Sequence, residues 1–476
     1  MIGLLAVGMM ATLLPGKVQH ARAAGTLRIT LADPPDSRDP HRSRLPVGWL
    51  FARLLHRGLY AFPQAPFPAG AMPVPDVATE MPVFSDDGLT VTIPLRGGLR
   101  FSGGRVFKAS DAASSISRFV SADGEVARAI PFRSARAPDD RTLEITLARP
   151  AYDLAWLLAH PSAAILPAGT PAARGTVPGL GPYRVTQDIP DGRTVLERNP
   201  HWRDDPVRDA PSDGIMLTVK SSPADAFAAV GSGMADMVGE PGPPDIWPSD
   251  HRSPLEAASR CTRLVLANHR VSPLGDAAIR QRLARRVAGA TVGAWTANAL
   301  PPIIVGGGGD PRPPLSEISS RPSLTLVATQ SGRDRTDTTR LRNALQPVAD
   351  IRVILVPPDR LGEVLTSRSR PALVLFTWCG AVPGQGAAAM LEDLFGPAGF
   401  APRSSRLARE INSARAAVDP EVARNRWKRV AQTIAREALI MASSVTPERG
   451  AFGRDLTNPM ATPMFPQGDP ANLSRR

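Results

Sequence analysis

The stretch that decides the fold is PDVATEMPVFSDDGLTVTIPLRGGLRFSGGRVFKASDAASSISRF, which runs from Pro75 to Phe119. Residues 85–88, SDDG, predict a turn because Asp and Gly tolerate the backbone conformations that turns require. The residues that follow, LTVTI, alternate apolar and polar side chains, which predicts a half-buried strand. The segment Leu99–Phe101 is expected to resume this strand after a pair of glycines.

A helix is expected at the end of this stretch. Ser110 and Asp111 stand where a helix N-cap should be. Apolar residues then recur at Ala112, Ile116 and Phe119, which is a spacing typical of a helix with one buried face. A pair of strands that leads into a capped helix indicates an α/β protein, and these features by themselves indicate no more than that.

The order of these pieces is more specific than their periodicity. After the SDDG turn and its strand, the pattern LRxGLxFxxGxxFxAxD precedes the helix, and this order resembles the signature of family 5 extracellular solute-binding proteins. These proteins are the peptide, nickel and oligosaccharide receptors of ATP-binding-cassette (ABC) importers. A second block, GLGPYRV at 179–185 followed by RTVLERNPHW at 193–202, is similar to another motif of the family. The two blocks occur in the right order and at a fitting distance.

The resemblance implies an α/β fold of the periplasmic-binding-protein-like type II, in which two lobes are joined by a two-strand hinge and an accessory lobe is added. The implied division is a signal peptide at 1–23, lobe I at 24–43 with 178–262 and 437–476, an accessory lobe at 44–177, and lobe II at 263–436. The ligand would bind between the two lobes and be enclosed when the hinge closes.

The amino terminus predicts export. An apolar run from Ile2 to Leu14 has the length of a signal-peptide core and is too short for a comfortable membrane span. Ala21-Arg22-Ala23 fits the small-x-small cleavage rule, so cleavage is expected after Ala23. No positive charge precedes the run, which departs from the usual pattern, and no cysteine follows it to support a lipid anchor. A buried N-terminal helix is the alternative.

The charge balance bears on the class of partner. The chain of 476 residues carries 56 Lys and Arg against 44 Asp and Glu, a formal net charge of +12. Nucleic-acid binding would need these basic residues clustered on one face with aromatic residues between them. The arginines instead stand among acids, as in Arg203-Asp204-Asp205. The sequence therefore argues against a nucleic-acid partner and favours a loose attraction to an anionic cell surface.

A short motif resembles the ligand site of peptide-binding family members. Trp378-Cys379-Gly380-Ala381 stands where those proteins often have Trp-Cys-Ala-Asp-Tyr, at the end of a strand that faces the cleft. The resemblance implies a disulfide between Cys379 and Cys261, consistent with an oxidising compartment. It also implies ligand contacts by Trp378, Gly380 and Ala381. Two unpaired buried cysteines, and a Trp that only packs in a core, are the alternatives.

The motif departs from the family at its most important position. In the family, the Asp of this motif holds the α-ammonium group of a peptide, because a buried cation without a counter-charge is costly. This chain has Ala381 at that position, and no acid follows until Glu392. Either another carboxylate reaches the ligand, or the ligand lacks an amine, or the pocket has diverged.

The sequence contains no recognisable catalytic or metal-binding motif. Its seven histidines include no pair spaced as two ligands on one helix or turn, and Cys-x-x-Cys does not occur. No Gly-x-Ser-x-Gly elbow occurs, and the paired acids Asp86-Asp87 and Asp139-Asp140 stand in turn contexts. We expect no catalytic residue, no metal site and no cofactor, and hence a protein that is not an enzyme.

The function implied by the resemblance is that of the extracellular substrate-binding component of an ABC importer. Such a protein captures a peptide or peptide-like solute between two lobes and delivers it to membrane permease subunits, and a monomer is expected. One alternative is a secreted binding or signalling protein that no longer serves transport. Another is a receptor for a non-peptide ligand, such as an oligosaccharide or a nickel chelate.

Overall fold

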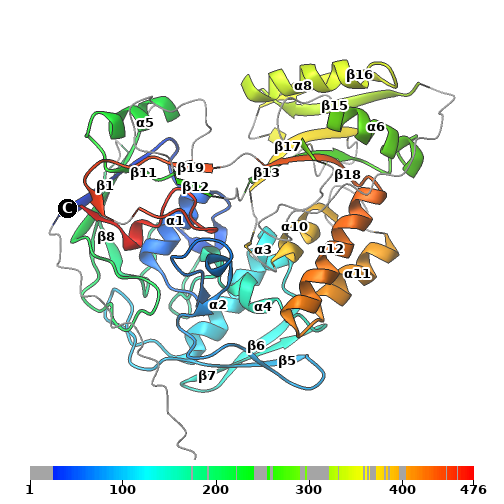
Figure 1. The fold of residues 1–476 in the computed structure, drawn as a ribbon. Helices are drawn as coiled ribbons and strands as arrows, with labels where there is room; N and C mark the ends of the chain where they lie inside the picture. Colours follow the sequence, from blue (N-terminus) through cyan, green and yellow to red (C-terminus); the bar gives the residue numbers. More distant parts are fainter. Residues whose placement is uncertain are drawn as a thin grey trace, which may run out of the picture.

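The computed structural model is an α/β structure built on three main sheets (Figure 1). It describes residues 25–476 except 173–174, 190–191, 221, 241–254, 258–260, 290–294, 297–320, 331, 358–359, 362–363, 365–370, 380–381, 384–385, 396–403, 446–447, 458 and 476. None of the helices in these described residues combines the length and the apolar character that a membrane span needs.

The first sheet has the strand order β11-β1-β10-β9-β8. Its strands are β1 (Thr26–Leu31), β8 (Tyr183–Ile189), β9 (Arg193–Arg198), β10 (Gly214–Val219) and β11 (Met237–Val238). β1 runs parallel to both β10 and β11, and helix α5 (Pro223–Gly231) connects those two neighbours. β10, α5 and β11 therefore form a strand–helix–strand unit, with β1 inserted between its two strands. Apolar residues alternate along β1, which buries Leu27, Ile29 and Leu31.

The accessory sheet has the order β4-β5-β7-β6. Its strands are β4 (Val83–Phe84), β5 (Thr90–Pro94), β6 (Phe132–Asp139) and β7 (Thr142–Leu147). Around it lie helices α2 (Ala109–Ser121), α3 (Glu125–Arg128) and α4 (Leu154–Leu158) and the strand pair β2 (Tyr60–Ala61) and β3 (Val74–Pro75). Helix α1 (Pro46–Leu55) instead packs its apolar side chains with those of the first sheet. The SDDG turn is confirmed, since the N–H of Gly88 donates to the carbonyl oxygen of Ser85 at 2.8 Å.

Two local predictions in this region were wrong. The N-cap of helix α2 is Lys108, two residues before the expected Ser110, and Asp111 lies inside the first turn, where its carboxylate accepts the backbone N–H of Lys108 at 2.9 Å. Leu99–Phe101 forms only an isolated β-bridge, between Arg100 and Val106, because the chain turns back at once: the N–H of Gly104 donates to the carbonyl oxygen of Phe101 at 2.7 Å. Gly104 has a φ of +88°, which favours glycine.

The second sheet has the order β14-β18-β13-β17-β15-β16. Its strands are β13 (Cys261–Ala267), β14 (Trp295–Thr296), β15 (Ser323–Thr329), β16 (Asp350–Val356), β17 (Leu373–Cys379) and β18 (Ile440–Val445). The helices of this part are α6 (Ala277–Gly289), α8 (Gly332–Leu345), α10 (Ala387–Phe395), α11 (Ser405–Arg415) and α12 (Pro420–Arg436). Strands β15, β16 and β17 coincide with mainly apolar stretches of the sequence.

Two chain segments connect the first and second sheets, and they run side by side. On the outward path β12 (Leu255–Ala257) precedes β13, and on the return path β18 precedes β19 (Glu448–Gly450). β13 pairs antiparallel with β18, and β12 pairs antiparallel with β19. The carboxyl-terminal segment ends with the pair β20 (Leu456–Thr457) and β21 (Ser474–Arg475). Figure 1 shows the β12–β19 pair at the passage between the two halves of the molecule.

A buried ion pair joins helix α11 to the accessory region. The guanidinium group of Arg415 donates from Nε and Nη2 to the carboxylate of Asp153 at 2.9–3.0 Å, and from Nη1 to the carbonyl oxygen of Ala129 at 2.7 Å. The two side chains are 0% and 1% exposed. A single apolar cluster includes α10, α11 and α12 as well as the accessory sheet, so these parts share one core. The division into lobes at particular residues stays a prediction.

Candidate ligand-binding site

Three parallel strands of the first sheet end at the same edge, which we call the carboxyl edge. β1 ends at Leu31, β10 at Val219 and β11 at Val238. In open α/β sheets, ligands bind in the crevice outside the carboxyl ends of the strands. The residues that follow these strands, among them Asp33 and Glu240, are therefore the first candidates for ligand contacts.

Glu240 is the most unusual residue of the carboxyl edge. Its Oε2 accepts the backbone N–H of Ala32 at 3.0 Å, which fixes the carboxylate beside the end of β1. Burial raises the pKa of Glu240 to about 7, the hydrogen bond from Ala32 opposes this rise, and the negative charge of Asp33 adds to it. The Asp33 side chain is exposed. Glu240 thus stands at the boundary between its neutral and charged forms at neutral pH.

The backbone holds Glu240 in place through a close approach at the preceding residue. The N–H of Gly239 donates to the carbonyl oxygen of Thr30 at 2.8 Å. A Cβ atom at Gly239 would lie 2.5 Å from Cδ2 of Leu31, which is nearer than real Cβ contacts come. Glycine lets β11 continue alongside β1 for one more residue, so that the next side chain reaches the end of β1.

The electrostatics of this edge suit a cation. Among the described residues, Glu240 has backbone hydrogen-bond partners and no ion-pair partner. A half-buried carboxylate is stabilised in its charged form when an opposite charge comes within about 4–6 Å. A ligand that brings an ammonium or guanidinium group to this edge would supply that charge.

The carboxyl edge lies next to the connections between the two sheets. The chain leads from Glu240 towards β12, and Phe452, just after β19, forms a β-bridge with Met237 of β11. Both connecting segments are thereby tied to the edge strand of the first sheet. A change in the angle between the two sheets would move the second sheet relative to Glu240.

The structure places the residues singled out in the sequence as follows. Trp378 belongs to β17, is 5% exposed and packs in the large apolar cluster. Gly380 and Ala381 lie outside the described residues. Ligand contacts by these three residues stay a prediction, and the burial of Trp378 means that a ligand touching it would need the packing around it to open.

The two cysteines lie directly opposite each other in the backbone register. Strands β13 and β17 are antiparallel, and the register pairs Cys261 with Cys379. Directly opposed residues in an antiparallel pair have Cα atoms about 4.5–5.5 Å apart, within the range that a disulfide spans. The register is compatible with the implied disulfide, which stays a prediction.

The sequence analysis did not find Glu240 or its relation to Asp33. Glu240 is bonded to a residue 208 positions away, a contact that no local pattern reveals. A usable signal was present, because Met237-Val238-Gly239-Glu240 is a short apolar strand followed by glycine and an acid. In an α/β chain, such an acid falls at the carboxyl end of a strand, where ligands bind.

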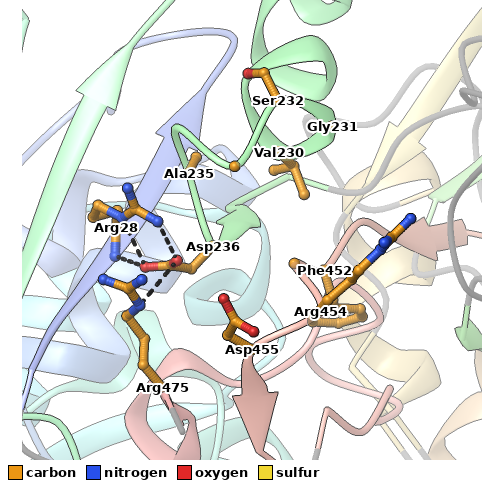
Figure 2. Close-up of a pocket in the computed structure, with 12 residues that line it drawn as sticks. Arg28, Val230, Gly231, Ser232, Ala235, Asp236, Phe452, Arg454, Asp455 and Arg475 are labelled. Carbon is orange, nitrogen blue, oxygen red and sulfur yellow. Dashed lines mark hydrogen bonds and ion pairs between the residues drawn. The ribbon is translucent and has the colours of Figure 1, made fainter.

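A surface pocket of about 410 Å³ opens at the amino-terminal end of β11 (Figure 2). Its charged groups are largely used within the protein: Arg28 donates from Nη2 and Nε to Asp236 at 2.7 and 3.2 Å, and Nε of Arg475 lies 3.4 Å from the same carboxylate. These bonds fasten the carboxyl-terminal segment to β1. The pocket is at the opposite end of the strand from the carboxyl edge, and we do not assign the ligand to it.

Comparison with known proteins agrees with the resemblance noted in the sequence. Residues 72–284 match the family model for bacterial extracellular solute-binding proteins, family 5, middle region. These residues make up less than half of the chain, and over them the chain is similar to family 5 of the extracellular solute-binding proteins. The resemblance noted in the sequence is confirmed, and family 5 is a family of binding proteins.

An individual relative agrees with this match. A glutathione-binding protein, GsiB, of Pectobacterium atrosepticum is 29% identical over 212 residues, which cover 42% of this chain and 39% of the relative. The chain therefore spans about two fifths of the length of the curated relative that it matches.

Solved structures extend the similarity to nearly the whole chain. Clavulanic acid biosynthesis oligopeptide binding protein 2 has a TM-score of 0.80 at 22% identity, and the match covers 95% of this chain and 96% of that one. A dipeptide binding protein from Pseudoalteromonas, in complex with Met-Leu, has a TM-score of 0.75 at 14% identity. That match covers 94% of this chain and 100% of the other one. At these identities the similarity establishes the fold, and the predicted α/β fold of type II is confirmed.

Proposed function

We propose that this protein is a family 5 solute-binding protein and the extracellular substrate-binding component of an ABC importer. It would enclose a peptide or peptide-like solute and present it to permease subunits. The observation that carries the proposal is the pair of adjacent connections, β12 with β19 and β13 with β18, between two α/β sheets. Two adjacent connections act as a hinge, because they let the sheets rotate towards each other while keeping them in register. The family match supports the same function.

The proposed mechanism is binding and closure, with no bond made or broken. The solute first contacts the carboxyl edge of the first sheet. Contacts with the second sheet then favour the closed arrangement, since a ligand shifts such an equilibrium only as far as its affinity for the two states differs. The permease then binds the closed form. A monomer suffices for each of these steps, and no cofactor or metal takes part.

Glu240 is proposed to hold the cationic group of the solute, together with the exposed Asp33. The family's usual acid is replaced by Ala381, so a peptide with a free amino terminus needs another counter-charge. Glu240 supplies one that is half-buried and fixed by the backbone. The names of the relatives support the ligand class, because glutathione and Met-Leu are both short peptides with a free amino group.

The test is a thermal-shift and calorimetric screen of the purified mature protein. The arms are dipeptides, glutathione, N-acetylated versions of the best peptides, oligosaccharides and nickel chelates. A ligand present at about 100 times its Kd stabilises the folded state by about 2.7 kcal/mol, which raises the Tm measurably. We expect a rise with free peptides and a smaller one with the acetylated peptides. If oligosaccharides or nickel chelates alone bind, the peptide assignment is wrong. If no class binds, the importer assignment is wrong.

Export is proposed to depend on residues 1–23, which lie outside the described residues. The family is extracellular by its description, and the apolar run before Ala23 supports removal of a signal peptide at that residue. Amino-terminal sequencing of the protein recovered outside the cytoplasm should begin at Ala24. A mature protein that retains the apolar run would contradict this proposal.

A further inference from the structure

Helices α11 and α12 form a surface hairpin with two very different faces (Figure 1). Their inner face is apolar and completely buried, with Leu407, Ile411, Val430 and Ile434 all 0% exposed. The buried ion pair between Arg415 and Asp153 fixes the hairpin to the accessory region. The outer face is therefore held in a defined orientation.

The outer face of the hairpin is strongly basic. Apart from the buried Arg415, residues 405–436 contain seven basic residues and three acidic ones. The basic residues are Arg406, Arg409, Arg424, Arg426, Lys428, Arg429 and Arg436, each exposed or half-buried. This short segment therefore supplies a large share of the chain's net charge of +12.

A groove of about 280 Å³ lies between the two helices, and three arginines line it together with Glu410 and Ser413. Nη1 of Arg426 donates to the carbonyl oxygen of Ser413 at 2.7 Å, and Glu410 accepts from Nε of Arg406 at 3.1 Å. Among the described residues, Arg409 and Arg429 have no ion-pair or hydrogen-bond partner for their guanidinium groups. Two uncommitted guanidinium groups therefore face a space that could admit an anionic oxygen group.

The chemistry of this groove fits phosphate. A guanidinium group presents a planar fork of donors that matches the oxygens of a phosphate group, and it stays charged at all physiological pH values. Nucleic acid is a poor fit, because base stacking needs exposed aromatic rings and Trp427, the one aromatic residue in 405–436, is 1% exposed. Phosphates displayed on a flat, anionic surface match a basic face that spans two helices.

We propose that the groove of Arg409, Arg426 and Arg429 is a docking site for the phosphate headgroups of an anionic phospholipid bilayer. The surrounding basic residues add attraction that depends on distance and salt. This inference goes beyond the proposed function, since a solute-binding protein need not touch lipid. Docking would keep the protein near the membrane surface and shorten its search for a membrane partner.

The test compares vesicles of phosphatidylcholine with vesicles that also contain phosphatidylglycerol, using co-sedimentation of the full mature protein. A triple variant, Arg409→Gln, Arg426→Gln and Arg429→Gln, removes the groove's charge. A matched control, Arg133→Gln, Arg286→Gln and Arg335→Gln, removes the same charge from exposed positions elsewhere. Each arginine near an anionic membrane changes the membrane partition coefficient about fivefold. The groove variant should therefore bind the anionic vesicles about 100-fold more weakly. The control should lose far less.

Three results would overturn the proposal. The first is equal binding to both kinds of vesicle, and the second is an equal loss in the groove variant and the control, which would mean diffuse charge without a site. The third is complete displacement from vesicles by millimolar glycerol phosphate, which would mean a site for a free phosphate ester. Circular dichroism checks that both triple variants are folded. Solute binding is measured separately on the same variants, so failure of the proposed transport function would leave the vesicle result standing.

Discussion

Removing the cation from the buried pair of Arg415 and Asp153 should be among the most damaging single changes in this protein. Both side chains are at most 1% exposed, and three hydrogen bonds join them. Burial raises the pKa of Asp153 above its usual value, and the charge of Arg415 opposes that rise. The guanidinium group of Arg415 therefore keeps the buried carboxylate of Asp153 charged, which burial alone would disfavour.

The magnitude follows from what each variant leaves behind. Arg415→Met leaves a buried carboxylate without a partner and frees the carbonyl oxygen of Ala129, and breaking a buried pair in this way costs about 3–5 kcal/mol. Replacing both residues, as Arg415→Met with Asp153→Leu, removes the stranded charge and should recover most of that loss. The matched control is Arg406→Met, because its partner Glu410 is half-exposed on the same helix, and its loss should be below about 1 kcal/mol.

The assay is urea unfolding at pH 7, followed by circular dichroism and Trp fluorescence. We expect the free energy of unfolding to fall in the order wild type, Arg406→Met, double variant and Arg415→Met. A loss below about 1 kcal/mol in Arg415→Met would refute the reasoning, because it would mean that water or another group satisfies Asp153. A double variant that is as unstable as Arg415→Met would also contradict it, since the stranded charge would then not be the cause.

Three further predictions concern stability. Burial lowers the pKa of His41 to about 4 and that of His56 to about 3. The stability that these neutral side chains contribute is therefore complete above pH 6.5 and is lost as the pH falls towards those values, by about 3 kcal/mol for each near pH 4. Urea titrations from pH 7 to pH 4 should show this loss, with a shallower fall in His56→Gln. Gly181→Ala should cost about 1–3 kcal/mol, because its Cβ would lie 2.4 Å from the backbone carbon of Leu55, whereas Gly103→Ala, with nothing within 4 Å, should cost little in the same assay. Reduction should raise the mass of the native exported protein by two hydrogens and lower its stability by about 3–5 kcal/mol if Cys261 is bonded to Cys379; two free thiols before reduction would exclude the bond.

The strands were predictable because their signal is local. Alternating apolar residues predicted β5 to within a residue, and β1 and β7 show the same alternation. The α2 cap was misread because Asp111 acts from inside the first turn, where an acid binds the N–H of the residue before the helix. Leu99–Phe101 was misread because four nearby glycines allow a tight loop that periodicity alone does not distinguish from a strand.

The candidate site was harder to predict because its contacts join distant parts of the chain. Glu240 is bonded to Ala32, 208 positions earlier, and Arg415 to Asp153, 262 positions earlier. Family resemblance directed attention to Trp378 and Ala381, and the departure at Ala381 raised the question of another carboxylate. Only the arrangement of parallel strands brings Glu240 to the carboxyl edge and so offers an answer.

The central claim is that two sheets joined by adjacent strands close around a solute, and small-angle X-ray scattering tests it most directly. The mature protein is measured alone and with a saturating amount of the best peptide from the screen, and again as Glu240→Gln. The account predicts a smaller radius of gyration with peptide, and a higher peptide concentration needed for that change in Glu240→Gln. Calorimetric binding of the peptide with an unchanged radius of gyration and scattering profile would contradict the account.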